Sequence, residues 1–307
     1  MSSRLLEALK SRTLLGDGAM GTQLQLAGLE PGGCGEAWNV DHPEKVLEIQ
    51  RRYVEAGSDC LITNTFGGCS IMLDRHENGD RVAEINAAGV RIAREAFGDR
   101  EGFVIGDIGP FGGIMEPYGE IAAQTVRDSF RQQADALVEA GADAVIIETQ
   151  TSYEELGIGI EEAKAAGAPC VIGSMAYDVT QDRSEIRTMM GISPEEAAQF
   201  MVDANVDIVA VNCGAGVDVG WAARAVAAYR KVSDLPTMAQ PNAGIPELVD
   251  MKAVYRQSPE DMVSELPDLI GAGASIVGGC CGSTPDHIKL FRQLLDQRSK
   301  NLQEQSK

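Results

Sequence analysis

Short apolar runs rich in β-branched residues alternate with longer helical stretches along the whole chain, and this alternation constrains the fold more than any other feature. Hydrophobic periodicity and helix-end signals predict eight strand-and-helix units. The expected strands lie at 13–16, 60–64, 103–107, 144–148, 170–175, 208–212, 237–240 and 275–278. The expected helices lie at 43–56, 81–96, 125–140, 153–166, 194–203, 221–231, 259–270 and 284–296. Because strands that are apolar along nearly their whole length are typical of a parallel sheet covered on both faces, this pattern predicts an α/β fold, a (β/α)8 TIM barrel.

Three of the expected helices end in similar glycine-containing phrases, which supports a repeated unit. The phrases are 54–59, 138–143 and 269–274, and glycine at a helix end permits a left-handed cap before the next strand. No linker divides the 307 residues, so we expect one domain over 1–307. Within it we expect a long loop at 241–258 and a polar, frayed tail at 298–307.

The net charge and the number of cysteines limit which partners the chain can bind and in which compartment it is expected. The formal net charge of -20 opposes binding to nucleic acid or an anionic membrane, because both depend on clustered Lys and Arg. The N-terminus lacks the apolar core of a signal peptide, and no run of about 18 apolar residues predicts a membrane span, so we expect a cytoplasmic protein. The 7 cysteines are odd in number, which favours a metal or catalytic thiol over a disulfide framework.

Three cysteines stand directly after expected strands. Cys213 follows the strand at 208–212, and the adjacent pair Cys280 and Cys281 follows the strand at 275–278. These side chains can meet, because the carboxyl ends of all barrel strands lie on one rim, where TIM-barrel chemistry takes place. The glycines that flank the adjacent pair permit the irregular backbone that two neighbouring ligands need. Three thiolates with one open position are typical of catalytic zinc, so we predict a Zn²⁺ site at these cysteines.

The other four cysteines fit ordinary packing roles. Cys60 and Cys170 fall inside expected strands, where a free cysteine behaves as a small apolar residue. Cys34 and Cys69 fall in expected loops, for which we favour a surface or packing role. A disulfide between the two adjacent cysteines would be strained, so we do not expect one.

Six short phrases mark the ends of the expected strands. They read LLGDGAMGT (14–22), TNTFG (63–67), GDIGP (106–110), VNC (211–213), QPNAGIP (240–246) and GGCCGSTP (278–285). In this order the phrases resemble the homocysteine methyltransferase family, and within it the homocysteine-binding module of cobalamin-dependent methionine synthases. The resemblance implies a (β/α)8 barrel, a zinc site of three cysteines, and methyl transfer to the sulfur of homocysteine to form methionine.

The rim offers a partner for each charged group of homocysteine. The strand-end carboxylates of Asp17 and Glu148 match the family's ammonium-binding positions, and a glycine-rich turn can present backbone N–H groups to the carboxylate. That turn comprises Gly18, Ala19 and Met20. Asn242 corresponds to a family position that approaches the zinc when substrate is absent. A zinc-bound thiol is deprotonated at neutral pH and stays nucleophilic, whereas a free thiol with a pKa near ~8.5 is mostly protonated.

The methyl donor is less constrained than the acceptor. Relatives use a methylated corrinoid, betaine or S-methylmethionine, and betaine users carry an aromatic residue where this chain has Gly67 and Gly68. Trp38 remains as an aromatic that could contact a cationic donor. Because the aromatic residue of betaine users is missing at Gly67 and Gly68, we favour a corrinoid donor. The 307 residues leave no room for corrinoid and folate modules, so we expect the donor as methylcobalamin or on a separate corrinoid protein. The alternatives are a betaine- or S-methylmethionine-dependent enzyme, another acceptor thiol, or a non-catalytic zinc thiol-binding subunit.

Overall fold

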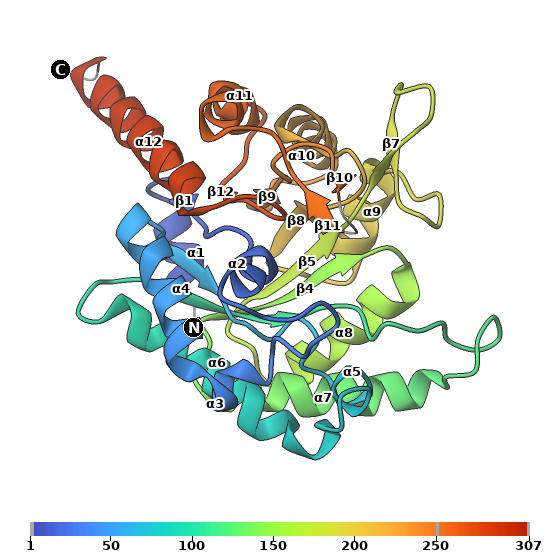
Figure 1. Cartoon of the computed structure of the whole chain (residues 1–307). Coiled ribbons are helices and arrows are strands. Elements are labelled where there is room, and N and C mark those ends of the chain that lie inside the picture. Colours follow the sequence, from blue (N-terminus) through green and yellow to red (C-terminus); the bar gives the residue numbers. More distant parts are fainter. Residues whose placement is uncertain (1–2, 250–251, 306–307) are drawn as a thin grey trace.

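An eight-stranded parallel sheet forms the centre of the structure, a computed structural model that describes residues 3–249 and 252–305. The strands neighbour one another in the order β1-β12-β9-β8-β5-β4-β3-β2. They are β1 (Leu14–Leu15), β2 (Cys60–Ile62), β3 (Phe103–Ile108), β4 (Ala144–Gln150), β5 (Val171–Met175), β8 (Ile208–Asn212), β9 (Thr237–Gln240) and β12 (Ile276–Val277). All eight predicted strands are present, and the sheet curves into a nearly closed barrel (Figure 1).

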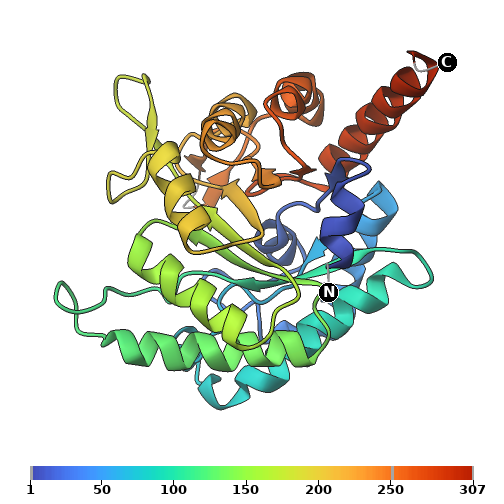
Figure 2. The ribbon, with the colours of Figure 1, turned by 180° about the vertical axis from the view of Figure 1, so that it is seen from behind.

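A helix follows each barrel strand and packs on the outside of the sheet, as two opposite views show (Figures 1 and 2). These helices are α4 (Pro43–Ala56), α6 (Val82–Phe97), α7 (Ala123–Glu139), α8 (Tyr153–Ala165), α9 (Pro194–Asp203), α10 (Val219–Val232), α11 (Pro259–Gly271) and α12 (Pro285–Gln305). Their apolar side chains recur at helical spacing; in α4, for example, Val46, Ile49 and Tyr53 are buried. The predicted (β/α)8 fold is confirmed.

The junction between β1 and β2 closes the barrel through side chains as well as backbone. The N–H of Asp59 donates to the carbonyl of Leu15 at 2.7 Å, and the N–H of Leu15 donates to the Asp59 carboxylate at 2.8 Å. Nearer the carboxyl ends, the carboxylate of Asp17 accepts the N–H of Ile62 at 2.8 Å. Two aspartates therefore connect β1 to β2, whereas the other neighbouring strands pair as parallel ladders, with one register shift between β4 and β5.

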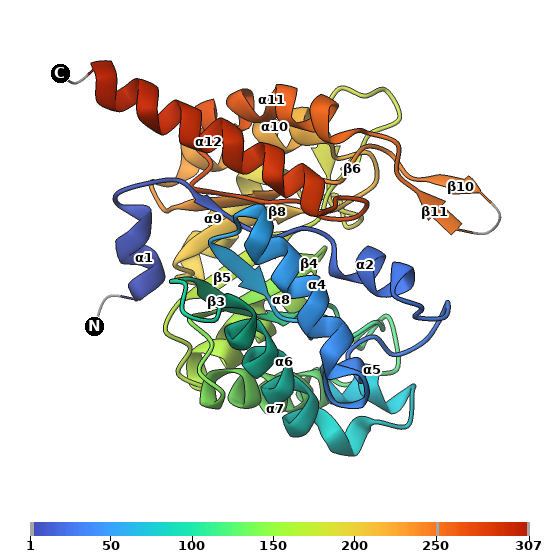
Figure 3. The same cartoon turned by 60° about the vertical axis from the view of Figure 1, so that its left-hand side comes forward.

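Apolar side chains fill the barrel interior at the end where the strands begin. Every barrel strand or the residue preceding it contributes to this core, and Leu5 of the short helix α1 (Arg4–Leu9) packs into it. Helix α1 lies on the opposite side of the barrel from helix α2 (Met20–Leu26) (Figure 3). Cys60 and Cys170 are fully buried in this core, as predicted. A ligand can therefore reach the barrel axis only from the carboxyl ends of the strands.

The predicted loop at 241–258 contains regular structure. Strands β10 (Glu247–Val249) and β11 (Lys252–Val254) pair antiparallel as a hairpin that projects from the barrel mouth (Figure 3), and residues 250–251 lie outside the described part of the chain. A second small hairpin, β6 (Asp178–Val179) with β7 (Ile186–Arg187), follows β5.

The predicted frayed tail at 298–307 is wrong over most of its length. Helix α12 continues to Gln305, and residues 306–307 lie outside the described residues. The segment from Arg298 to Gln305 contains no glycine or proline and several strong helix formers, so the preceding helix can extend through it. In the described ranges 3–249 and 252–305, no helix has both the length and the apolar character needed to cross a membrane.

Candidate active site at the carboxyl ends of the strands

The three predicted zinc ligands lie together beyond the ends of β8 and β12. Cys213 directly follows β8, and Cys280 and Cys281 follow β12 after two glycines. Strand β9 lies between these two strands, and backbone carbonyls at its carboxyl end accept hydrogen bonds from both cysteine-containing loops. The N–H of Cys213 donates to the carbonyl of Gln240 at 3.2 Å, and the N–H of Cys280 donates to that of Pro241 at 2.8 Å. The parallel register thus brings distant cysteines to one place.

The sulfur atoms form a compact triangle. The Sγ of Cys281 lies 3.8 Å from that of Cys213 and 4.0 Å from that of Cys280, and all three lie within 4.8 Å of one another. Tetrahedral zinc with Zn–S bonds of about 2.3 Å requires sulfur separations of about 3.8 Å. Cys213 adopts a left-handed backbone conformation, with φ of 55°, which few non-glycine residues tolerate outside functional sites. The donor set and its spacing fit a zinc ion.

The three thiols differ in acidity because they bond to one another. Hydrogen bonds from Cys213 and Cys280 lower the pKa of Cys281 to about 3. Bonds to Cys213 and Cys281, together with burial, raise the pKa of Cys280 well above its usual range. For Cys213 the bond from Cys280 acts to lower the pKa, but the bond to Cys281 and burial raise it to about 12. The hydrogen bonds among the thiols thus favour a thiolate at Cys281, and a bound metal ion would favour thiolates at all three cysteines.

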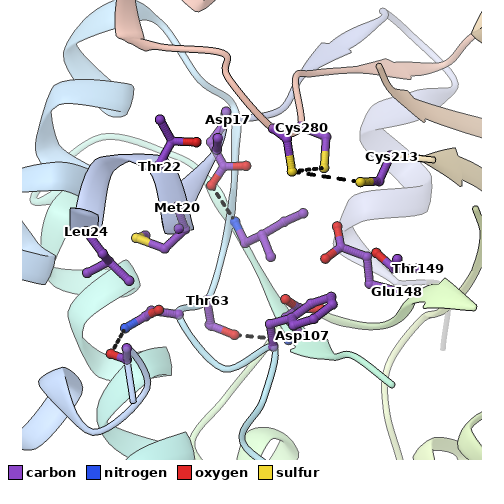
Figure 4. Close-up of a pocket in the computed structure, with 18 of the residues that line it drawn as sticks. Asp17, Met20, Thr22, Leu24, Thr63, Asp107, Glu148, Thr149, Cys213 and Cys280 are labelled. Carbon is purple, nitrogen blue, oxygen red and sulfur yellow. Dashed lines mark hydrogen bonds between the residues drawn. The ribbon is translucent and has the colours of Figure 1, made fainter. Parts of the chain in front are cut away.

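A cavity of about 360 Å³ opens beside the cysteines. Asp17, Asp107 and Glu148 line it (Figure 4), and Glu36 lines it from the loop before helix α3 (Trp38–Asp41). Among the described lining residues there is no Lys, Arg or His. Apolar lining residues are Met20, Leu24, Leu29, Ile62 and Phe66. The cavity suits a small ligand with a cationic group and an apolar portion.

Burial raises the pKa of the carboxyl groups of Asp17, Glu148 and Asp107. It raises the pKa of Asp17 to about 8, although the N–H of Ile62 acts in the opposite direction. Burial followed by the charge of Cys281 raises the pKa of Glu148 to about 7. Burial followed by the charge of Glu148 raises the pKa of Asp107 well above its usual range. A cation among these groups would favour their ionised forms, so the cavity is suited to bind an ammonium.

The turn at Gly18, Ala19 and Met20 lines the cavity, and buried side chains hold it in place. The hydroxyl of Ser283 accepts the N–H of Ala19 at 3.1 Å and donates to the carbonyl of Cys280 at 2.7 Å. The hydroxyl of Tyr53 donates to the carbonyl of Ala19 at 3.1 Å. A Cβ at Gly18 would lie 2.8 Å from the Ser283 hydroxyl and 2.9 Å from the Tyr53 ring, so only glycine fits there. The turn and the cysteine loop are thus linked through one serine.

A second strained residue faces the cavity at the end of β4. Thr149 has a φ of 58°, which is unfavourable for a β-branched side chain. The side chain of Asn212 holds it from both sides, accepting the N–H of Thr149 at 3.1 Å and donating to its hydroxyl at 2.7 Å. The hydroxyl of Ser174 in turn donates to Asn212 at 2.6 Å. This network fixes the wall beside Cys213.

Two residues singled out from the sequence lie outside the cavity lining. Asn242 is buried, and its amide donates to the carbonyl of Gly214 at 2.9 Å, behind Cys213. Its Oδ1 atom has no hydrogen-bond partner among the described residues. Trp38 lies away from the cavity, and the Nζ of Lys45 already sits 4.4 Å from its ring centroid. The expected aromatic contact from Trp38 to a cationic donor is therefore not supported.

Sequence reasoning missed the contribution of Asp107 to this site. The residue stands in the phrase 106–110 at a strand end, as Asp17 does. The ammonium and the carboxylate of homocysteine, however, already have partners in Asp17, Glu148 and the glycine-rich turn. Thr63, which follows β2, also lines the cavity, and its hydroxyl accepts the N–H of Asp107 at 3.0 Å. Only their position in the sequence indicated that these two residues belong to the site, since both lie at carboxyl ends of predicted strands and so at the same rim of the barrel.

Comparison with known proteins agrees with the fold. The family model for homocysteine S-methyltransferase matches residues 14–295. Methionine synthase of Mycobacterium leprae (strain TN) is 33% identical over 93% of this chain, and that of Mycobacterium tuberculosis (strain ATCC 25618 / H37Rv) is 32% identical over 93%. The chain spans only 24% and 25% of those two proteins.

Solved structures show the same architecture. The metallated form of the homocysteine methyltransferase MmuM from Escherichia coli superposes with a TM-score of 0.75 at 22% identity, covering 95% of this chain and 99% of that one. Its oxidized form gives a TM-score of 0.76 at 21% identity, covering 94% and 99%. At this identity the likeness concerns the fold. Since the family model covers the barrel from its first strand to its last helix, the chain belongs to the homocysteine S-methyltransferase family.

Proposed function

We propose that this chain binds zinc through Cys213, Cys280 and Cys281 and transfers a methyl group to the sulfur of homocysteine, forming methionine. The observation that carries the proposal is the triangle of sulfur atoms at zinc-compatible distances beside an acidic cavity. When bound, zinc would keep the substrate sulfur deprotonated and nucleophilic at neutral pH. Cysteine ligands suit this role because their negative charge leaves sulfur electron-rich, whereas nitrogen ligands favour activation of water.

The chain's own residues would orient the amino-acid part of homocysteine. Asp17 and Glu148 offer carboxylates to its ammonium, from opposite sides of the cavity (Figure 4). The backbone at Gly18 and Met20 faces the same space, and those two N–H groups have no partner among the described residues. They can receive the substrate carboxylate, while the N–H of Ala19 already bonds to Ser283. Both charged ends of the amino acid would then be bound without a basic side chain.

A methylated corrinoid carried by a separate protein is the donor we propose. Phe66 is the only aromatic residue among the described lining residues, so the cavity lacks the aromatic cage that a small onium donor such as betaine requires. Large exposed apolar side chains in the described part of the chain all lie on segments that follow carboxyl ends of barrel strands. They are Leu26, Phe66, Ile114, Tyr118, Met189, Met190 and Ile245. Exposed apolar residues gathered at one rim favour contact with a protein.

The test compares methyl donors at equal enzyme concentration with zinc-loaded protein. We expect methionine to form from homocysteine with methylcobalamin, free or protein-bound, and not with betaine or S-methylmethionine. Turnover with either onium donor and none with methylcobalamin would contradict the donor assignment. No turnover with any donor, although zinc and homocysteine bind, would indicate a thiol-binding subunit instead of an enzyme.

A further inference from the structure

Two buried carboxyl groups lie next to each other in a cavity wall whose described lining residues include no Lys, Arg or His. Asp107 in β3 and Glu148 in β4 belong to neighbouring parallel strands, in which Asp107 is in register with Ile146. The two residues are 3% and 8% exposed, and Figure 4 shows both at the same side of the cavity. A pair of ionised carboxylates in this position would repel each other and lose hydration.

The hydrogen bonds around Asp107 do not satisfy its carboxyl group. Its backbone N–H donates to Thr63, and its carbonyl accepts from Thr65 at 2.8 Å and from Gln133 at 2.9 Å. Its Oδ1 atom, however, is buried with no partner among the described residues. A buried oxygen that lacks a donor costs free energy if it is charged, and much less if the group carries its own proton.

The other titratable groups that face Asp107 are also acids, namely Glu148, Glu36 and Asp17. Two of them have backbone donors of their own. Glu36 accepts the N–H of Gly67 at 2.8 Å, and Asp17 accepts that of Ile62 at 2.8 Å. No backbone or side-chain N–H of the described residues donates to the Glu148 carboxylate. Glu148 is therefore the neighbour with a carboxylate free to accept a hydrogen bond from Asp107.

We propose that Asp107 is a neutral carboxylic acid whose O–H donates to the carboxylate of Glu148. The proton stays bonded to Asp107, so the pair carries a single negative charge, located on Glu148. Burial, followed by the charge of Glu148, raises the pKa of Asp107 well above its usual range. This direction agrees with the buried Oδ1 atom that lacks a partner among the described residues, because both favour a protonated Asp107.

The role of this bond rests on the proposed function. A carboxylate held by a neighbouring O–H points in a fixed direction, so Glu148 would meet the ammonium of homocysteine without first reorienting. Asp107 is then a positioning residue that acts through Glu148. Because asparagine also offers a donor and carries no charge, the conservative variant Asp107→Asn imitates the proposed state, whereas Asp107→Ala removes it.

Infrared difference spectra of the zinc-loaded full chain at pH 7 test the protonation directly. Because burial also raises the pKa of Asp17 and of Glu155, the signal is a difference between proteins: one carbonyl stretching band of a protonated carboxylic acid should be lost from the wild type to Asp107→Asn, and Glu148→Gln should retain that band. This readout needs no substrate, so it stands even if homocysteine proves not to be the ligand. If Asp107→Asn loses no such band relative to the wild type, or if Glu148→Gln is the variant that loses it, the proposal is wrong.

Binding measurements test the positioning role. We expect Asp107→Asn to bind homocysteine within about threefold of the wild type, and Asp107→Ala and Glu148→Gln to bind at least about tenfold more weakly. All three should bind 4-mercaptobutanoate, which lacks the ammonium, within about threefold of the wild type. Should Asp107→Asn lose homocysteine affinity as strongly as Glu148→Gln, Asp107 would be an ionised partner of the ammonium and the proposal would be wrong. If Asp107→Ala fails to fold, the Asn variant and the infrared band still decide.

Discussion

Replacement of Ser283 by alanine should weaken homocysteine binding without removing the zinc ligands. The Ser283 hydroxyl is fully buried and connects the cysteine loop to the turn at Ala19. In the alanine variant the carbonyl of Cys280 keeps the N–H of residue 283 at 3.1 Å, but the N–H of Ala19 loses its acceptor. A buried donor left unpaired costs about 1–3 kcal/mol, so the free energy of unfolding should fall by about that amount.

Part of this cost can be relieved if the turn moves, and that movement would displace the backbone that faces the ligand. We expect homocysteine affinity to fall by about tenfold, measured by calorimetry, while metal analysis still finds about one zinc per chain. Ser129→Ala is the matched control, since the Ser129 hydroxyl is also buried and accepts the N–H of Ile71 at 3.2 Å, away from the cavity. The control should lose similar stability in urea and keep its affinity. Equal affinities for both variants would refute the coupling.

Three further changes address the metal, the pH dependence and the backbone. Cys281→Ala should abolish zinc retention in metal analysis while the barrel stays folded, and a full zinc content in that variant would contradict the assigned ligands. Burial raises the pKa of Glu155 from 4.5 to about 7, so its contribution to the free energy of unfolding is fully present below pH 4.5 and is lost as the pH rises through about 7. Other buried acids add to the pH dependence, so the comparison is with Glu155→Gln: between pH 4.5 and above 7, urea titrations should show the wild type losing about 3 kcal/mol more than this variant, and equal losses would disprove the assignment. Gly214→Ala should lower the free energy of unfolding by about 3 kcal/mol or more, because φ at this position is 89° and a Cβ there would overlap the carbonyl of Tyr177. Thermal unfolding measures this loss, and a variant as stable as the wild type would show that the loop can rearrange.

The architecture could be predicted because each barrel strand is buried on both faces. Val104 to Ile108 in β3 and Ala144 to Ile147 in β4, for instance, are buried at every position. Runs of this kind stand out from helical periodicity even in a single sequence. The cysteine trio was predictable for a related reason, since three thiols at strand ends of one barrel must share a rim.

Features that depend on side-chain packing were harder to predict from the sequence. Asp17 and Asp107 both end strands, and nothing in the sequence indicates that Asp107 would have a buried oxygen without a donor. Trp38 is a suitable aromatic by composition, yet its ring is occupied by Lys45 in the folded chain. The helical tail was missed because polar residues extend a helix as well as they form a frayed end, and only the absence of glycine and proline distinguishes the two.

The seam between β1 and β2 links ligand binding to closure of the barrel. Asp17 accepts the N–H of Ile62 across this junction and, under the proposed function, would also meet the ammonium of the substrate. An ammonium favours the ionised carboxylate, and an ionised carboxylate is a stronger acceptor than a neutral acid. Occupancy should therefore reduce local breathing of the barrel, so that the amide hydrogen of Ile62 exchanges with solvent more slowly when ligand is bound. The Asp17 side chain would thus both bind the ligand and stabilise the pairing that closes the barrel.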